Sequence, residues 1–136
     1  MRLVLDTNVL IAAYATEGAC MRLYRYCMRR HVLVTSEILI EELREKLLRK
    51  LKIASPDVDD LLGFYREHCE IVMPRPLQSP VSRDPDDDWV IATAIAGECR
   101  CIVSGDGDLL TLETYQGIRM IRPASFWEFE AGSSEV

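Results

Sequence analysis

Acidic residues recur along the chain where an apolar segment gives way to a helical pattern. Asp6 follows the apolar run Leu3–Leu5, and Asp106 follows the apolar run at residues 101–103. A further acidic run, Asp84–Asp88, opens a third helical pattern. Hard divalent cations prefer carboxylate oxygens as ligands, and carboxylates that lie close together without a cation repel one another. No cationic partner for these acids is evident in the sequence, so they indicate a divalent metal site if the fold brings them together.

Short apolar runs alternate with amphipathic helical patterns along the chain. We expect strands at residues 3–5, 32–34, 71–73, 101–103 and 118–121, with helices over residues 9–14, 20–30, 36–52, 56–68, 84–96 and 109–112, and a last helix from residue 123. This alternation predicts the α/β class, as a three-layer α/β/α sandwich with a mainly parallel, about five-stranded central sheet. Parallel strands end at a shared edge, so Asp6 and Asp106 are expected to lie close together there.

Part of the acidic pattern is also typical of helix caps. Asp84 fits an N-cap, Pro85 fits the first helical position, and the acids that follow favour the positive end of the helix dipole. Asp6 can likewise be interpreted as the cap of the helix that follows it. Capping does not explain why Asp6 and Asp106 fall at the same edge of the predicted sheet.

The composition is typical of a globular protein, with 136 residues, 49% hydrophobic and 28% charged. We expect one domain over residues 1–130 and a loose tail over residues 131–136. No apolar run approaches the ~20 residues of a membrane span, and no signal-peptide cleavage site follows the apolar N-terminus. The five cysteines are odd in number and lack C-x-x-C spacing. They indicate neither a disulfide framework nor structural zinc, and they favour a cytoplasmic location.

The net charge of −6 argues against broad electrostatic capture of nucleic acid. Two local basic groups remain, one around Arg29 and Arg30 and the other over residues 44–52. Each is typical of the solvated face of an amphipathic helix, and each is equally a candidate to contact the phosphates of a nucleic acid.

Four segments, taken in order, carry a family resemblance. They are Asp6-Thr7-Asn8, the stretch from Ser36-Glu37 to Glu42-Leu43, the run Asp84–Asp88, and Val103–Asp106 with Asp108 close behind. In this order and spacing the chain resembles the PIN-domain nucleases from Arg2 to about Phe129. Within that family it most resembles the VapC-like branch, the toxin components of prokaryotic toxin–antitoxin pairs. The resemblance implies a PIN-like fold and an endoribonuclease that depends on Mg²⁺ or Mn²⁺.

The resemblance also implies roles for individual residues. The residues expected to be catalytic are Asp6, Glu42, Asp87, Asp88 and Asp106. Those expected to hold the metal are Asp6, Asp87, Asp88 and Asp106. The residues expected to support them are Thr7, Asn8, Ser104 and Asp108. Arg29 and Arg30 are expected to bind the RNA backbone. The metal would activate the water that hydrolyses an RNA phosphodiester bond.

Two of these assignments stay open. Helical phase favours Glu42 over its neighbour Glu41, because Glu42 lies nearer the apolar stripe of its helix. Asp87 and Asp88 both fit the family's spacing to Asp106, and both are kept as candidates.

The resemblance also implies binding partners, and two alternative functions stay open. The resemblance implies an RNA substrate, an antitoxin protein as partner, and a homodimer, with no membrane. One alternative is a phosphatase of the haloacid-dehalogenase kind, which also places an aspartate after its first strand. That family needs a second acid where this chain has Asn8. The other alternative is a PIN-fold binding module without catalytic activity.

Overall fold

The computed structural model describes residues 1–134. A six-stranded sheet forms its centre, in the order β3-β2-β1-β4-β6-β5. The strands are β1 (Arg2–Leu5), β2 (Val32–Thr35), β3 (Cys69–Ile71), β4 (Cys101–Val103), β5 (Thr114–Tyr115) and β6 (Ile118–Ile121). All neighbouring strands pair in parallel except the short edge strand β5, which runs antiparallel to β6. The predicted α/β fold with a mainly parallel sheet is confirmed, and β5 is an addition to the expected strands.

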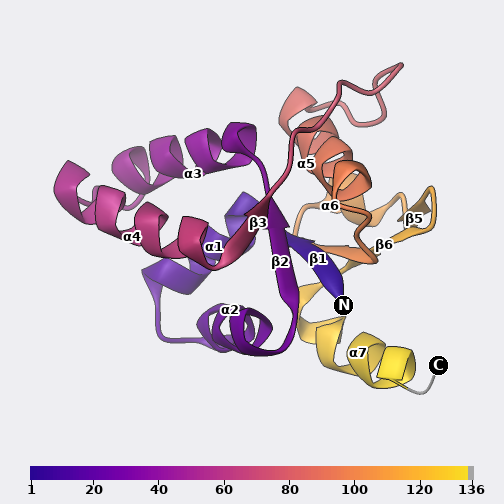
Figure 1. The fold of residues 1–136 in the computed structure, drawn as a ribbon, viewed down its shortest axis with the longest axis horizontal. Coiled ribbons are helices and arrows are strands. Elements are labelled where there is room, and N and C mark those ends of the chain that lie inside the picture. The colour runs from indigo at the N-terminus through magenta and orange to yellow at the C-terminus, as the bar shows by residue number, and fades with distance from the viewer. Residues whose placement is uncertain (135–136) are drawn as a thin grey trace.

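Helices cover both faces of this sheet, which gives three layers (Figure 1). The helices are α1 (Thr7–Ala15), α2 (Ala19–Arg30), α3 (Glu37–Arg49), α4 (Ser55–Glu67), α5 (Pro85–Ala96), α6 (Gly107–Leu110), the 3₁₀ turn η1 (Pro123–Ser125) and α7 (Phe126–Ser134). In Figure 1, α1–α4 lie to the left of the strands, and α5 and α6 lie to their right. Among the described residues, no helix is both long and apolar enough to cross a membrane.

The central strand β1 contributes to the cores on both sides of the sheet, because successive side chains of a strand point to opposite faces. Leu3 and Leu5 pack in the core that α1–α4 cover, and Val4 packs in the core that α5 covers. All three side chains are buried. A continuous apolar run is therefore what this strand position requires, as expected for a parallel sheet covered on both faces.

The register of β1 and β4 fixes the place of the candidate site. Leu5 pairs with Val103, so the residues that follow them, Asp6 and Ser104, both lie at the carboxyl edge of the sheet. The backbone N–H of Asp6 donates to the carbonyl of Val103 over 2.9 Å, which extends the pairing by one hydrogen bond.

Three predicted boundaries are wrong. The strand expected at residues 71–73 lies at Cys69–Ile71, because pairing with β2 begins at Cys69 and the chain has left the sheet by Met73, which is 91% exposed. The helix expected to reach residue 52 ends at Arg49, and Lys52 has a left-handed backbone with φ of 52°, which a helix cannot contain.

The loose tail expected over residues 131–136 is the third. Helix α7 continues through Ser134, with Phe129 packed against the core and Ser133 donating to its carbonyl over 3.0 Å. Residues 135 and 136 lie outside the described residues.

Candidate functional site

Asp6 is a buried carboxylate that does not act as a side-chain cap. It is 3% exposed and occupies the N-cap position of α1, yet its side chain makes no capping hydrogen bond. Its Oδ2 instead accepts a hydrogen bond from Ser104 Oγ over 2.7 Å. Its other oxygen has only a long contact, 3.5 Å, with Thr7 Oγ1. Because no capping hydrogen bond is made, the interpretation of the Asp6 side chain as a helix cap is wrong. A buried carboxylate is costly unless it is paired, and the Ser104 hydroxyl is its partner here.

Ser104 joins the ends of two strands. Its hydroxyl donates to Asp6 and accepts the backbone N–H of Asp106 over 2.9 Å. The Asp106 carboxylate in turn accepts the backbone N–H of Asp108 over 2.9 Å and so caps α6. The segments that carry Asp6 and Asp106 are thus tied together by one hydroxyl group, as the parallel topology predicted.

Three carboxylates converge beside Asp6. Oxygen atoms of Asp87, Asp106 and Asp108 all lie within 4.8 Å of one another. Asp87 is 4% exposed and accepts a hydrogen bond from Ser82 Oγ over 2.9 Å. Two residues expected to hold a metal are therefore in this group. Asp108, which was expected only to support them, is the third member.

Asp88 lies outside this group, although the sequence left it equal to Asp87. Its carboxylate accepts the backbone N–H groups of Val81, at 3.1 Å, and Ser82, at 2.8 Å. These bonds hold the loop before α5, and the loop in turn supplies the hydroxyl that contacts Asp87. The geometry therefore favours Asp87 as the candidate ligand and gives Asp88 a role in positioning the loop.

Glu42 faces the site and Glu41 does not. Thr7 Oγ1 donates to Glu42 Oε1 over 3.0 Å, and the Glu42 side chain is 16% exposed. Glu41 is exposed to solvent on the outer side of α3. The helical phase of α3 thus places the preferred residue of the pair where the sequence analysis expected it.

Lys46 is a member of the site that the sequence analysis missed. Its ammonium lies 2.8 Å from Glu42 Oε1, 3.1 Å from Asn8 Oδ1 and 3.2 Å from Thr7 Oγ1. A second cation, Arg83, lies 2.7 Å from Asp108 Oδ1. The expectation that no cation accompanies the acids is wrong. The spacing of Glu42 and Lys46, four residues apart on one helix, was the available signal.

Burial and mutual repulsion disturb the titration of the acids. Burial raises the pKa of Asp87 to about 7; the Ser82 hydroxyl opposes this shift, and the negative charges of Asp106 and Asp6 add to it. Burial also raises the pKa of Asp6, with the Ser104 hydroxyl opposing and Glu42 adding to the shift. Burial and repulsion thus disfavour the charged form of these two acids, and a bound cation would favour it.

The donor set of Asp87, Asp106 and Asp108 fits a hard divalent cation. All the ligand atoms are carboxylate oxygens, the type that Mg²⁺ and Mn²⁺ prefer over nitrogen or sulfur. The three oxygens lie within 4.8 Å of one another, whereas adjacent ligands of an octahedral Mg²⁺ lie roughly 2.9 Å apart. The carboxylates would therefore move closer together around a bound ion.

Arg29 and Arg30 are not brought to the acids. They form the last turn of α2, directly before β2, and are exposed at the amino edge of the sheet. Arg29 lines a hollow of about 430 Å³ together with Arg22, Arg25, Tyr26 and Trp127. Their contact with RNA stays a prediction.

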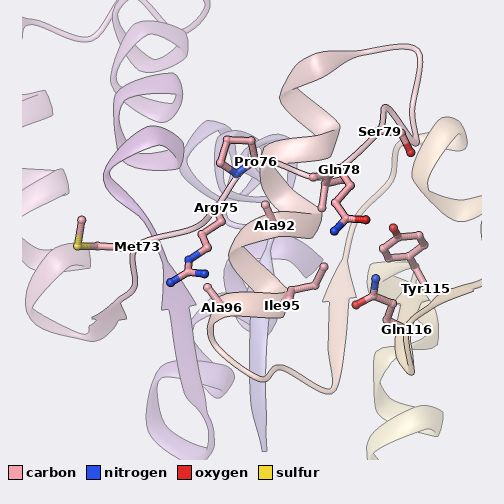
Figure 2. A pocket seen from close by; sticks show the side chains of 11 residues that line it. Met73, Arg75, Pro76, Gln78, Ser79, Ala92, Ile95, Ala96, Tyr115 and Gln116 are labelled. Atoms are coloured by element: carbon pink, nitrogen blue, oxygen red, sulfur yellow. The ribbon is translucent and has the colours of Figure 1, made fainter.

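A separate hollow lies on the outer side of α5. It has a volume of about 600 Å³ and runs between the loop that follows β3 and the turn between β5 and β6 (Figure 2). Arg75 and Gln78 come from the loop, Ala92 and Ile95 from the helix, and Tyr115 from β5 (Figure 2). None of the predicted catalytic residues lines it.

Comparisons with known proteins agree with this architecture. The model of the PIN domain family matches residues 2–108. The solved VapBC2 complex from Rickettsia felis, bound to a DNA fragment from its promoter, is similar with a TM-score of 0.60 and 13% identity over 90% of this chain and 98% of that chain. VapBC-1 from nontypeable Haemophilus influenzae is similar with a TM-score of 0.61 and 13% identity over 91% of this chain and 99% of that chain. At such low identity these likenesses concern the fold. No curated protein is similar enough in sequence to count as a match.

Proposed function

The chain belongs to the PIN domain family, and on that premise we propose that it is a metal-dependent endoribonuclease that hydrolyses phosphodiester bonds of RNA. The observation that carries the proposal is the convergence of Asp87, Asp106 and Asp108 beside the buried Asp6 at the carboxyl edge of a parallel sheet. Helix capping explains the presence of Asp106, whose side chain caps α6. It does not explain Asp6, which is buried and whose side chain caps no helix.

Asp87, Asp106 and Asp108 would hold Mg²⁺ or Mn²⁺ in this proposal. A bound divalent ion lowers the pKa of water and neutralises the charge of a phosphodiester. The chain's own residues fix the positions of the acids. Ser82 orients Asp87 and Ser104 orients Asp6, each through one hydrogen bond to one carboxylate oxygen. Such outer contacts hold the ligand geometry that the reaction requires.

Asp6 would contribute a second function within the site. Since Ser104 occupies its Oδ2, the other oxygen remains available to accept a hydrogen bond from the attacking water. Burial raises the pKa of Asp6 in the absence of metal, and a bound cation would oppose that shift and keep the carboxylate ionised to accept this hydrogen bond.

We further propose that the protein is the toxin of a toxin–antitoxin pair. The likeness in fold to two VapBC complexes and the motif pattern from Asp6 to Asp108 support this assignment. An antitoxin protein would then be its partner, and a homodimer its assembly. Inducing the wild-type chain should arrest growth of a bacterial host, and inducing the Asp106→Asn variant to the same level should not.

The class of reaction is tested with two substrates. Purified protein should cleave single-stranded RNA in Mn²⁺, should stop in chelator, and should release no phosphate from a small phosphomonoester. Phosphate release would instead favour the haloacid-dehalogenase alternative. In this chain Asn8 stands where that family needs an acid, and its Oδ1 accepts from Lys46. Mn²⁺ binding without any cleavage would favour the silent binding module.

A further inference from the structure

Lys46 lies inside the acidic site although it belongs to a helix whose other basic residues are outside it. Its side chain is 16% exposed, whereas Arg49 and the neighbouring Lys50 are exposed to solvent. The Lys46 ammonium contacts Glu42 from its own helix and two residues, Thr7 and Asn8, from the first turn of α1. A simple pair of charges four residues apart on a helix needs no partner from a second helix.

Two of the three donors of this ammonium form hydrogen bonds within the site, and its charge is paired there. A lysine ammonium has three N–H donors and no acceptor. Lys46 donates to Asn8 Oδ1 over 3.1 Å and to Thr7 Oγ1 over 3.2 Å, and its ammonium forms an ion pair with Glu42 Oε1 at 2.8 Å. Because it is only 16% exposed and is already paired with Glu42, the ammonium is poorly placed to contact a phosphate of RNA. Lys46 is therefore a positioning residue that neutralises acids, and it differs in this from a surface lysine that grips a nucleic acid.

The charges of the site divide into two halves. On one side Asp87, Asp106 and Asp108 converge, with the exposed Arg83 at Asp108. On the other side Glu42 is paired with Lys46. The Thr7 hydroxyl connects the two halves, because it accepts from Lys46, donates to Glu42 Oε1 and lies 3.5 Å from Asp6 Oδ1.

We propose that the Lys46 ammonium takes the place of a second metal ion beside Glu42. The site would then bind one divalent cation, between Asp87, Asp106 and Asp108. The inference rests on the proposed metal site and adds its stoichiometry. The oxygens that Lys46 contacts are the hard oxygen donors that a second Mg²⁺ or Mn²⁺ would require. With the ammonium 2.8 Å from Glu42 Oε1, such an ion would meet a like charge at the carboxylate that it needs.

The removal of Lys46 should open a second cation site. In Lys46→Met the aliphatic stem is retained and the charge is lost, which leaves Glu42 without its cation beside Asn8 and Thr7. A second Mn²⁺ can then replace the missing charge. In the double variant Lys46→Met/Glu42→Gln neither charge is present, and no second ion should bind.

The experiment counts Mn²⁺ ions bound per chain, by titration with detection of free Mn²⁺ by electron paramagnetic resonance. We expect one ion in the wild type, two in Lys46→Met, one in the double variant, and one in Lys50→Met, the matched control at the exposed C-cap of α3. If Lys46→Met does not fold, Lys46→Gln replaces it with the same expectation. Two ions in the wild type, none in the wild type, or one ion in the folded Lys46 variants would each overturn the proposal.

The outcome is separable from that of the proposed function. Counts of one and two ions without RNA cleavage would retain the role of Lys46 and reject the nuclease. If the wild type cleaves RNA and binds two ions, the proposed nuclease activity stands and the proposed role of Lys46 is wrong.

Discussion

At the scale of single residues, neighbours in the sequence have opposite tasks. Asp87 points into the acidic site and Asp88 holds the loop before α5. Glu42 faces Thr7 and Lys46, and Glu41 faces solvent. In each pair the chemistry of the side chains is the same. The direction in which the helix points each side chain therefore decides which carboxylate belongs to the site.

The raised pKa of Asp87 predicts how stability depends on pH in the absence of metal. The unfolded chain ionises Asp87 near its ordinary pKa of 3.8, and the folded chain ionises it only near 7. Between these values the folded state binds more protons, so this residue lowers the free energy of unfolding as pH rises from about 4 to about 7. Above pH 7 its contribution is constant.

Thermal melts in chelator measure this effect. Asp87→Asn should melt at a similar temperature to the wild type at pH 4 and several degrees higher at pH 8, because the amide carries no charge to bury. It should also lose the stabilisation that Mn²⁺ gives the wild type. A difference that stays the same between pH 4 and pH 8 would contradict the assigned shift.

Asp88→Asn, in contrast to Asp87→Asn, should lower the stability of the protein and keep its response to Mn²⁺. The amide group places an N–H donor opposite the backbone N–H groups of Val81 and Ser82, which now donate to the carboxylate. We expect a loss of about 1–2 kcal/mol in the free energy of unfolding. The rise in Tm on adding Mn²⁺ should be retained, because Asp88 does not contact the acidic group. A variant that keeps its stability but loses the Mn²⁺ response would identify Asp88 as a ligand.

At the scale of elements, the sequence predicts best where apolar runs and caps are strong. The positions of β1 and β4, and the start of α5 with Asp84 as cap and Pro85 in the first position, follow from local chemistry and are observed. The place of β3 was missed because its residues are amphipathic and partly exposed, so pairing with β2 decides it. The apolar run just after it misled the prediction. Lys46 was missed because its neighbours in α1 are far away in the sequence.

The turn after α5 tests the packing of that layer on the sheet. A Cβ added at Gly97 would lie 2.5 Å from Cγ1 of the buried Val34 on β2. Gly97→Ala should therefore force α5 or β2 to shift and should cost about 1–3 kcal/mol in the free energy of unfolding. Denaturant unfolding measures it.

Gly63 provides the matched control. It lies within α4, and a Cβ added there meets no atom within 4 Å. Gly63→Ala should stabilise the protein by about 0.5–1 kcal/mol, since alanine favours a helix interior over glycine. Equal effects of the two substitutions would contradict the close approach of α5 to β2.

At the scale of the whole molecule, the acidic and the basic–aromatic features lie at opposite edges of the sheet. The acids follow the carboxyl ends of β1 and β4. The hollow lined by Arg22, Arg25 and Trp127 is formed by residues of α2 and α7. These two helices lie toward the lower side of the molecule in Figure 1, whereas α5 and α6 lie toward the upper side. The sequence showed each group but not their separation, because only the topology assigns them to edges. An RNA that contacts both must extend across the molecule.

This separation predicts which RNA molecules depend on Arg29 and Arg30. Replacing both with alanine should reduce the slope of log Kd against log salt by about 1.4 for a long single strand, if each contacts one phosphate. Binding of a short oligonucleotide that reaches only the acidic edge should be unchanged. Binding is measured in chelator to prevent cleavage. An unchanged slope with the long strand would make these arginines part of the solvated surface.

The central claim is that the acids at the carboxyl edge hold the metal for RNA cleavage, and one comparison of rates tests it most directly. Asp106→Asn keeps the cap of α6, because asparagine caps helices as well as aspartate does, but removes a charged ligand. Asp60→Asn, on the exposed side of α4, is the matched control. The rate of Mn²⁺-dependent cleavage of single-stranded RNA should be that of the wild type in Asp60→Asn and should be lost in folded Asp106→Asn. Wild-type cleavage by the folded Asp106→Asn variant would contradict the account.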